Sequence, residues 1–269
     1  MRRILALLAA LSLAGASDDR PIRSDDFTKY RTTADLKRVI GTDRTYTEVL
    51  HAELLALDRD VRFNDHPTLR LDQPGGVRDT PELFVNLPKS VDSFWFTMTI
   101  RYSPGWSDTG TLLREQSSNA YKLIGWGWAH GYEDRGTLDF SNTNEYQLSM
   151  GLKPAGASGG GIFEIVRAGH TTDEWDSGEW YRYIVHFERV TSDSMRARLW
   201  ISRADATPVL RGDLRVAVPE RLGGAPLVDR VQFLYTFNQV RRTDQKQSIW
   251  LGEWKVFGPD ARDPLHVLD

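Results

Sequence analysis

The chain has 269 residues, of which 40% are hydrophobic and 26% charged, and it contains no cysteine. This composition is typical of a soluble globular protein, and its length allows one large β-domain or two ordinary domains. Without cysteine no disulfide can form, so the core has to be stabilised by burial alone. The formal net charge of −3 at pH 7 disfavours nucleic acid as the main partner, because nucleic-acid-binding surfaces are basic.

Residues 1–16 predict a cleaved export signal. Arg2 and Arg3 form a basic start, residues 4–13 are an apolar run, and residues 14–16 (AGA) provide a small-x-small cleavage site. Cleavage after this site removes two positive charges and takes the formal net charge from −3 to −5. The apolar run is too short for a mature membrane span, so we expect a secreted or periplasmic protein without a membrane anchor.

Residues 17–59 predict a polar lead-in that contains one helix. The first part, up to about residue 43, is rich in charged side chains. Within TYTEVLHAELLALD (45–58) four apolar residues recur at helical spacing: Val49, Leu50, Leu54 and Leu57. We therefore expect the helix of the lead-in at residues 45–58.

From about residue 60 onward the apolar pattern changes to a period of two, which is typical of β-strands. The clearest case is VDSFWFTMTIRY (91–102), where one face consists of Phe94, Phe96, Met98, Ile100 and Tyr102. Similar segments follow along the chain, separated by turns rich in glycine and proline. About nine to twelve strands without intervening helices predict a single all-β domain over residues 60–269, an antiparallel β-sandwich.

The stretch YKLIGWGWAH (121–130) predicts a surface on which sugars stack. Strand alternation puts Trp126 and Trp128 on one face together with Lys122 and His130. Flat aromatic rings offer sugars a large contact area at a low cost in conformational entropy. Core packing stays an alternative for these tryptophans, because a sandwich of this size also buries several tryptophans.

The strand segments come in a familiar order: TLRLDQPGG, FWFTMTIRYSPGW, NAYKLIGWGW, EWYRYIVHF, RARLWI and a terminal LGEWKVFG. This order, over about residues 60–258, resembles the concanavalin A-like jelly roll. That superfamily includes laminin-G-like domains, legume-type lectins and several polysaccharide lyases. The resemblance implies that a concave sheet carries a glycan groove and that the other sheet is a packing surface.

The segment QFLYTFNQ (232–239) is similar to the Tyr-Phe-Lys-Ala-Gly-x-Tyr-Asn-Gln strand of jelly-roll alginate lyases. Like that strand it comes next to last, and Asn238 and Gln239 match its final two residues. The family's catalytic tyrosine falls on Phe237, which has no hydroxyl group. Tyr235 lies two residues earlier, on the same face of the strand, and could supply a displaced hydroxyl.

The resemblance implies a polysaccharide lyase that acts on uronic-acid-containing glycans by β-elimination. This reaction needs a group that neutralises the carboxylate, a base and an acid. The side chains that we expect in catalysis are Arg114, His130, Tyr235 and Gln239. Those that we expect to bind substrate are Gln116, Lys122, Trp126, Trp128 and Asn238.

Two alternatives remain open: a non-catalytic, lectin-like module, and a laminin-G-like interaction or structural domain. The missing hydroxyl at Phe237 favours a binder. A glycoside hydrolase is less favoured, because Glu164 and Glu179 are lone acids and the paired carboxylates of hydrolases are missing. We expect a polysaccharide partner and a monomer.

No cofactor is expected, and metal-ligand spacing is absent among the histidines. The oxygen-rich stretch DRDVRFND (58–65) could hold a structural calcium ion at the rim of the sandwich, although a solvated turn is favoured. His186 alternates with core residues, so we expect it to point to solvent or to a backbone partner.

Overall fold

The structure is a computed structural model, and it describes residues 20–39, 46, 48–73, 81–104, 121–127, 135–140, 145–152, 162–171, 178–217, 228–235, 247–261 and 265. The predicted signal at residues 1–16 therefore lies outside the described residues. No helix among the described residues is long and apolar enough to cross a membrane.

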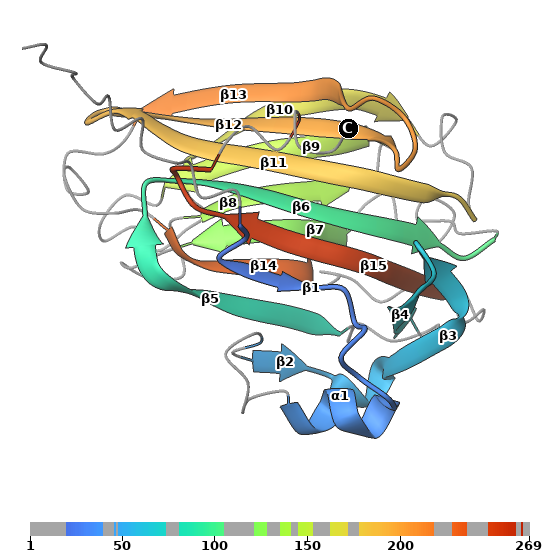
Figure 1. Cartoon of the computed structure of the whole chain (residues 1–269). Coiled ribbons are helices and arrows are strands. Elements are labelled where there is room, and N and C mark those ends of the chain that lie inside the picture. Colours follow the sequence, from blue (N-terminus) through green and yellow to red (C-terminus); the bar gives the residue numbers. More distant parts are fainter. Residues whose placement is uncertain are drawn as a thin grey trace, which may run out of the picture.

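Two antiparallel sheets form the two layers of a sandwich (Figure 1). Sheet A consists of β1 (Arg23–Asp25), β3 (Leu55–Phe63), β4 (His66–Gln73), β6 (Ser93–Tyr102), β11 (Trp180–Thr191), β12 (Ser194–Arg203), β13 (Val209–Ala217) and β15 (Gln247–Phe257). Sheet B consists of β2 (Glu48–Leu50), β5 (Glu82–Val91), β7 (Tyr121–Gly127), β8 (Arg135–Phe140), β9 (Glu145–Leu152), β10 (Ile162–Thr171) and β14 (Val228–Tyr235).

The order of the strands shows that neighbours in each sheet come from distant parts of the chain. Sheet A runs β13–β12–β11–β6–β15–β4–β3, with β1 paired to β15. Sheet B runs β10–β9–β8–β7–β14–β5–β2. The predicted antiparallel β-sandwich is confirmed, because the described strands form two sheets whose pairs are antiparallel.

The helix predicted at residues 45–58 is wrong. That stretch contains β2, a 3-10 turn at Ala52–Leu54 and the start of β3. His51 has a left-handed backbone (φ 51°) that no α-helix accommodates. Leu55 pairs with Leu71, so apolar residues that mimic a helical period in fact belong to different elements.

The α-helix of the lead-in is α1 (Thr33–Val39). Thr32 caps it, since the Thr32 hydroxyl accepts from the backbone of Asp35 and the Asp35 carboxylate accepts from the backbone of Thr32, both at 3.1 Å. The boundary predicted at residue 60 falls inside β3, and β1 and β2 extend sheets A and B. The segment before residue 60 is thus built into the sandwich.

Strand β6 is buried on both of its faces from Phe94 to Ile100. Its predicted inner face is confirmed, with Phe94, Phe96, Met98, Ile100 and Tyr102 at most 2% exposed. The outer face is also covered, because Trp95 packs with Ile184, Trp200 and Phe257 in a second apolar cluster. Ala261 and Leu265, which follow β15 in the sequence, pack against this cluster.

A buried polar network attaches the N-terminal segment to the last strand. Asp25 on β1 accepts from the Tyr30 hydroxyl at 2.7 Å and from the Phe27 backbone at 2.9 Å. Trp254 on β15 donates through Nε1 to the hydroxyl of Tyr46 at 3.0 Å. Burial raises the pKa of Asp25, and the hydrogen bonds to its carboxylate oppose this effect.

A close approach of the β3–β4 hairpin shapes the outer surface of sheet A. The register of β15 shifts between Leu251 and Glu253, which leaves Gly252 as an extra residue. A Cβ atom at Gly252 would lie 2.7 Å from the ring of Phe63, so only glycine fits there without movement of the hairpin. The Phe63 ring also lies 5.1 Å from the ring of Trp180.

Candidate functional site

Strands β7 and β14 are neighbours in sheet B, and they bring two predicted site residues together. Their register pairs Tyr235 with Lys122, Phe233 with Ile124 and Val231 with Trp126. Residues directly opposite each other on antiparallel strands have Cα atoms about 4.5–5.5 Å apart. Lys122 and Tyr235 are therefore immediate neighbours, although 113 positions of the sequence separate them.

The same register continues across the sheet through polar residues. Lys122 pairs with Asp139 on β8, Asp139 with Gln147 on β9, and Gln147 with Arg167 on β10. We call these five positions the polar row: Tyr235, Lys122, Asp139, Gln147 and Arg167. The last three were not predicted from the sequence, because pairing partners in other strands leave no local signal.

A β-bulge lies at the polar row. The register between β7 and β8 shifts between Lys122 and Ile124. Bulges of this kind redirect side chains and are common next to active sites. The bulge concerns the pairing of β7 with β8, since the register of β7 with β14 runs without a shift from the buried Ile124 to Lys122.

Trp126 lies at an alternate position of β7, in step with Ile124 and Lys122. It pairs with Val231, which is fully buried, and it alternates in step with the buried Ile124. The platform role of Trp126 stays a prediction.

The remaining predicted residues are outside the described residues, and their roles stay predictions: Arg114, Gln116, Trp128, His130, Asn238 and Gln239. Because β7 and β14 are antiparallel, the C-terminal end of β14 lies beside the N-terminal end of β7. Asn238 and Gln239 follow that end of β14 in the sequence. His130 follows the other end of β7, which is roughly 17 Å from Lys122 along an extended strand.

Charged and amide side chains that were not predicted from the sequence lie on the outer side of β5 and β14. Gln232 donates through Nε2 to Glu82 at 3.0 Å. The guanidinium of Arg230 lies 5.9 Å from the centre of the Phe84 ring. On β7 the partners of Gln232 and Arg230 are glycines, so this strand adds no side chain beside them. A ligand can approach the backbone closely at such positions.

His186 on β11 is buried and does not point to solvent, which corrects our expectation. It is 6% exposed, and its ring stacks on Trp95 at 4.0 Å. Arg198 approaches Nδ1 at 2.7 Å, and Ser93 Oγ lies 3.3 Å from Nε2. Arginine only donates, so Nδ1 accepts and Nε2 carries the proton. His186 therefore cannot take a proton from Ser93, which excludes a serine nucleophile at this place.

We predict that His186 makes the protein less stable in acid. Burial, and then the charge of Arg198, lower the pKa of His186 to about 3. In the unfolded chain its pKa is about 6.5, so between these values the unfolded state binds more protons. The stability from neutral His186 is complete above pH 6.5 and is lost as the pH falls. Between pH 7 and pH 5 we expect a loss of about 2 kcal/mol.

The measurement for His186 is urea unfolding at pH 7 and pH 5. The matched variant is His186→Asn, whose side chain does not titrate and should show a shallower pH dependence by about 2 kcal/mol. The other charged groups around the imidazole, Arg196, Arg198 and Glu188, are the same in both proteins. Equal pH dependence of the two proteins would refute the assignment.

The stretch 58–65 does not fit a calcium site. Asp58 Oδ1 accepts from the backbone of Asp60 and Val61 at 2.9 and 3.0 Å. Its Oδ2 accepts from Trp250 Nε1 at 2.9 Å and from Arg70 at 3.4 Å. Within the described ranges, no group of three or more histidine or acidic side chains could hold a metal ion.

Comparison with known proteins supports the fold. No protein-family model and no curated protein sequence matches the chain. Among solved structures it is similar to an endo-β-1,4-glucuronan lyase from the fungus Trichoderma reesei, with 14% identity over 76% of this chain and 86% of that one and a TM-score of 0.55. It is also similar to the marine PL-14 alginate lyase from Aplysia kurodai, with 10% identity over 89% of this chain and 100% of that one and a TM-score of 0.63.

A third similar structure is the alginate lyase Aly36B, with 12% identity over 89% of this chain and 98% of that one and a TM-score of 0.53. At these identities the likeness concerns the fold. The protein has the concanavalin A-like jelly-roll fold, and the predicted resemblance is confirmed.

Proposed function

We propose that the protein is an exported polysaccharide lyase that recognises uronic-acid-containing glycans on sheet B and cleaves them by β-elimination. The observation that carries the proposal is the direct pairing of Lys122 with Tyr235 in the polar row. A fold shared with glucuronan and alginate lyases adds support. Export rests on the signal predicted at residues 1–16.

The chemistry of the polar row suits this reaction. In β-elimination a base removes the C5 proton beside the sugar carboxylate, the C4–O bond breaks, and a C4–C5 double bond forms. The ammonium group of Lys122 is suited to neutralise the carboxylate, which stabilises the charge that develops on it. Tyr235 is the group in the row that we assign to both proton transfers: it takes the C5 proton as the base and then returns it to the leaving O4 as the acid.

Residues beyond the row complete the proposed site. We infer that Asn238 and Gln239 bind the substrate at the end of β14, because they follow Tyr235 closely in the sequence. Arg114 and Gln116 precede β7 and are proposed at the same edge. His130 and Trp128 follow the other end of β7 in the sequence, and the roles of His130 in catalysis and of Trp128 in substrate binding stay predictions.

Incubation with uronic-acid polymers tests the proposal. We expect absorbance from new carbon–carbon double bonds to rise with polyglucuronate or alginate and to stay constant with a neutral glucan. A constant trace with every uronate polymer, from a protein that is folded by circular dichroism, would refute the lyase.

A second candidate function is a non-catalytic glycan-binding module. Phe237 favours it, because this residue stands where similar lyases carry a catalytic tyrosine. Retention of the protein by uronate polymers without any elimination product would assign this function. Catalytic release of unsaturated products would exclude it.

A further inference from the structure

The outer face of sheet A carries a row in which tryptophan and arginine alternate across four strands. The register pairs Trp180 on β11 with Arg101 on β6, Arg101 with Trp250 on β15, and Trp250 with Arg70 on β4. We call these four residues the Trp–Arg row. With strands about 4.8 Å apart, the row is roughly 14 Å long. All four residues are half-buried, so part of each faces solvent.

The two tryptophan rings of the row are held in place by neighbours. Trp250 donates through Nε1 to Asp58 at 2.9 Å, which fixes the orientation of its ring. Trp180 packs against Phe63. Phe63 in turn lies so close to Gly252 that a Cβ atom at position 252 would not fit. Rings that are already oriented lose little conformational entropy when a ligand stacks on them.

The arginines of the row differ in their partners. Arg70 forms ion pairs with Asp58 at 3.4 Å and Asp72 at 3.1 Å. The guanidinium of Arg101 has no hydrogen bond or ion pair with any other described residue, and its Nε is buried without a partner. Because Nε is closed to solvent, an anionic ligand group would pair with the terminal nitrogens of the half-buried guanidinium.

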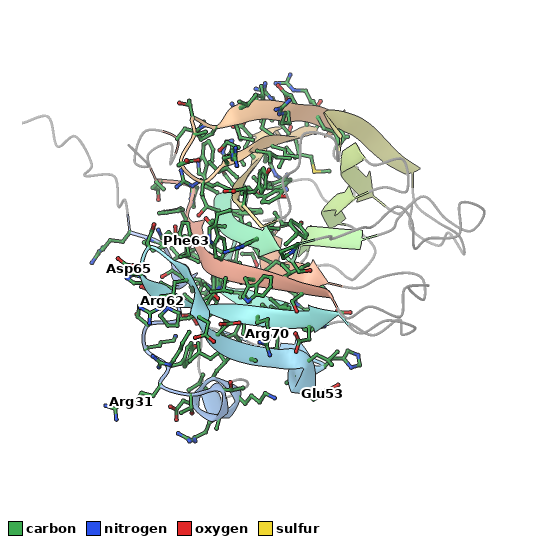
Figure 2. The ribbon with its side chains drawn as sticks, turned by 90° about the vertical axis from the view of Figure 1, so that its right-hand side faces the viewer. Arg31, Glu53, Arg62, Phe63, Asp65 and Arg70 are labelled. Carbon is green, nitrogen blue, oxygen red and sulfur yellow. The ribbon has the colours of Figure 1, made fainter. Side chains whose placement is uncertain are left out.

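A hollow lies at the Trp180 end of the row. Its volume is about 340 Å³, and Arg62 and Phe63 of the β3–β4 hairpin line it together with Trp180 and Arg182. Two carboxylates, Glu179 and Asp205, line it as well. In Figure 2, Arg62, Phe63 and Asp65 lie together at the hairpin, and Arg70 lies on the neighbouring strand. Like Arg101, Arg182 forms no ion pair among the residues that the structure describes. Two guanidinium groups without carboxylate partners thus lie next to an oriented tryptophan.

We propose that the Trp–Arg row binds a second stretch of an acidic polysaccharide. The apolar faces of two sugar rings stack on Trp180 and Trp250, and a sugar carboxylate pairs with Arg101 between them. The chain has a net charge of −3, so an acidic polymer requires a local cationic surface of this kind.

This surface lies in the sheet opposite the polar row, and it would hold the polymer without taking part in cleavage. When a polymer is bound at one of two surfaces of the same protein molecule, its local concentration at the other surface rises. The choice of a uronate polymer as ligand rests on the proposed function. The existence of the binding row is independent of whether sheet B catalyses elimination.

The test is affinity electrophoresis in native gels that contain polyglucuronate or alginate. We expect Arg101→Gln to weaken retention by about ten-fold in Kd, because it removes one charge-assisted, bidentate contact. Trp250→Phe, which keeps an aromatic ring but loses the bond to Asp58, should weaken retention less. The matched control is Arg196→Gln on the same sheet face, where Arg196 pairs with Asp213, and its retention should equal that of the wild type.

Three results would overturn the row: no retention of the wild type in either polymer, equal retention of wild type and Arg101→Gln, or equal weakening of Arg101→Gln and Arg196→Gln. Elimination of a short uronate oligosaccharide is measured in parallel and should be unchanged in Arg101→Gln. If elimination is absent but Arg101→Gln alone loses retention, the lyase proposal fails and the row stands. If elimination occurs and Arg101→Gln is retained normally, the row fails and the lyase stands.

Discussion

Replacing Trp254 by alanine should lower the free energy of unfolding by about 3–5 kcal/mol. Trp254 is fully buried, and its ring lies 5.7 Å from Tyr46 and 5.1 Å from Phe233 of the opposite sheet. The substitution therefore opens a cavity between the two layers. It also removes the donor to the Tyr46 hydroxyl, which is itself buried.

Urea unfolding measures this loss. Trp254→Phe keeps most of the apolar contact and should cost less than the alanine variant, since it loses chiefly the hydrogen bond. Val209→Ala serves as the surface control, because Val209 is 46% exposed, and it should change stability by about 0.5 kcal/mol or less. A loss below about 1 kcal/mol for Trp254→Ala would contradict a tightly packed core at this position.

The second large effect concerns the polar row. Lys122→Ala and Tyr235→Phe should each lower kcat for β-elimination by about 100-fold or more, which is the usual effect of losing a catalytic acid–base or charge-stabilising group. Because the two residues are direct partners, the double variant should lose much less than the product of the single losses. Steady-state kinetics on a uronate polymer measure all three variants.

Lys89→Ala is the matched control for the polar row. Lys89 is an exposed residue of β5 in the same sheet, and its loss removes the same charge away from the row. Its activity should equal that of the wild type. Activity within two-fold of the wild type in both Lys122→Ala and Tyr235→Phe would remove these residues from the mechanism, even if the protein cleaves uronate polymers.

The sandwich was predictable because its main signal is local. Alternation along 91–102 assigns five residues to the inner face of one strand, and all five are buried: Phe94, Phe96, Met98, Ile100 and Tyr102. The covering of the opposite face was not predictable. Trp95 is buried there by Ile184, Trp200 and Phe257, which the sequence places far away.

The helix prediction failed because tertiary structure overrode local propensity. Residues 45–58 are rich in good helix formers, but Leu55 pairs with Leu71 in sheet A and Val49 pairs with Leu83 in sheet B. Two different sheets thus take up one apparently helical stretch. The signal of the true helix was present in the capping pair Thr32 and Asp35.

Of the polar row, only the residues on β7 and β14 could be predicted from the sequence. Lys122 and Tyr235 were selected for their chemistry, and the register makes them partners. Asp139 and Arg167 join them through pairings across three strands, which no local pattern encodes. The Trp–Arg row was not predicted, because its four residues come from four separate strands.

The mass of the products released from polyglucuronate or alginate tests the central claim most directly. We predict oligosaccharides whose new non-reducing ends are unsaturated, so that their masses sum to the mass of the polymer that was cleaved. Products whose summed mass exceeds that of the polymer by one water molecule for each bond cleaved would contradict a lyase on sheet B. A polymer that stays intact in the presence of folded protein would contradict it as well.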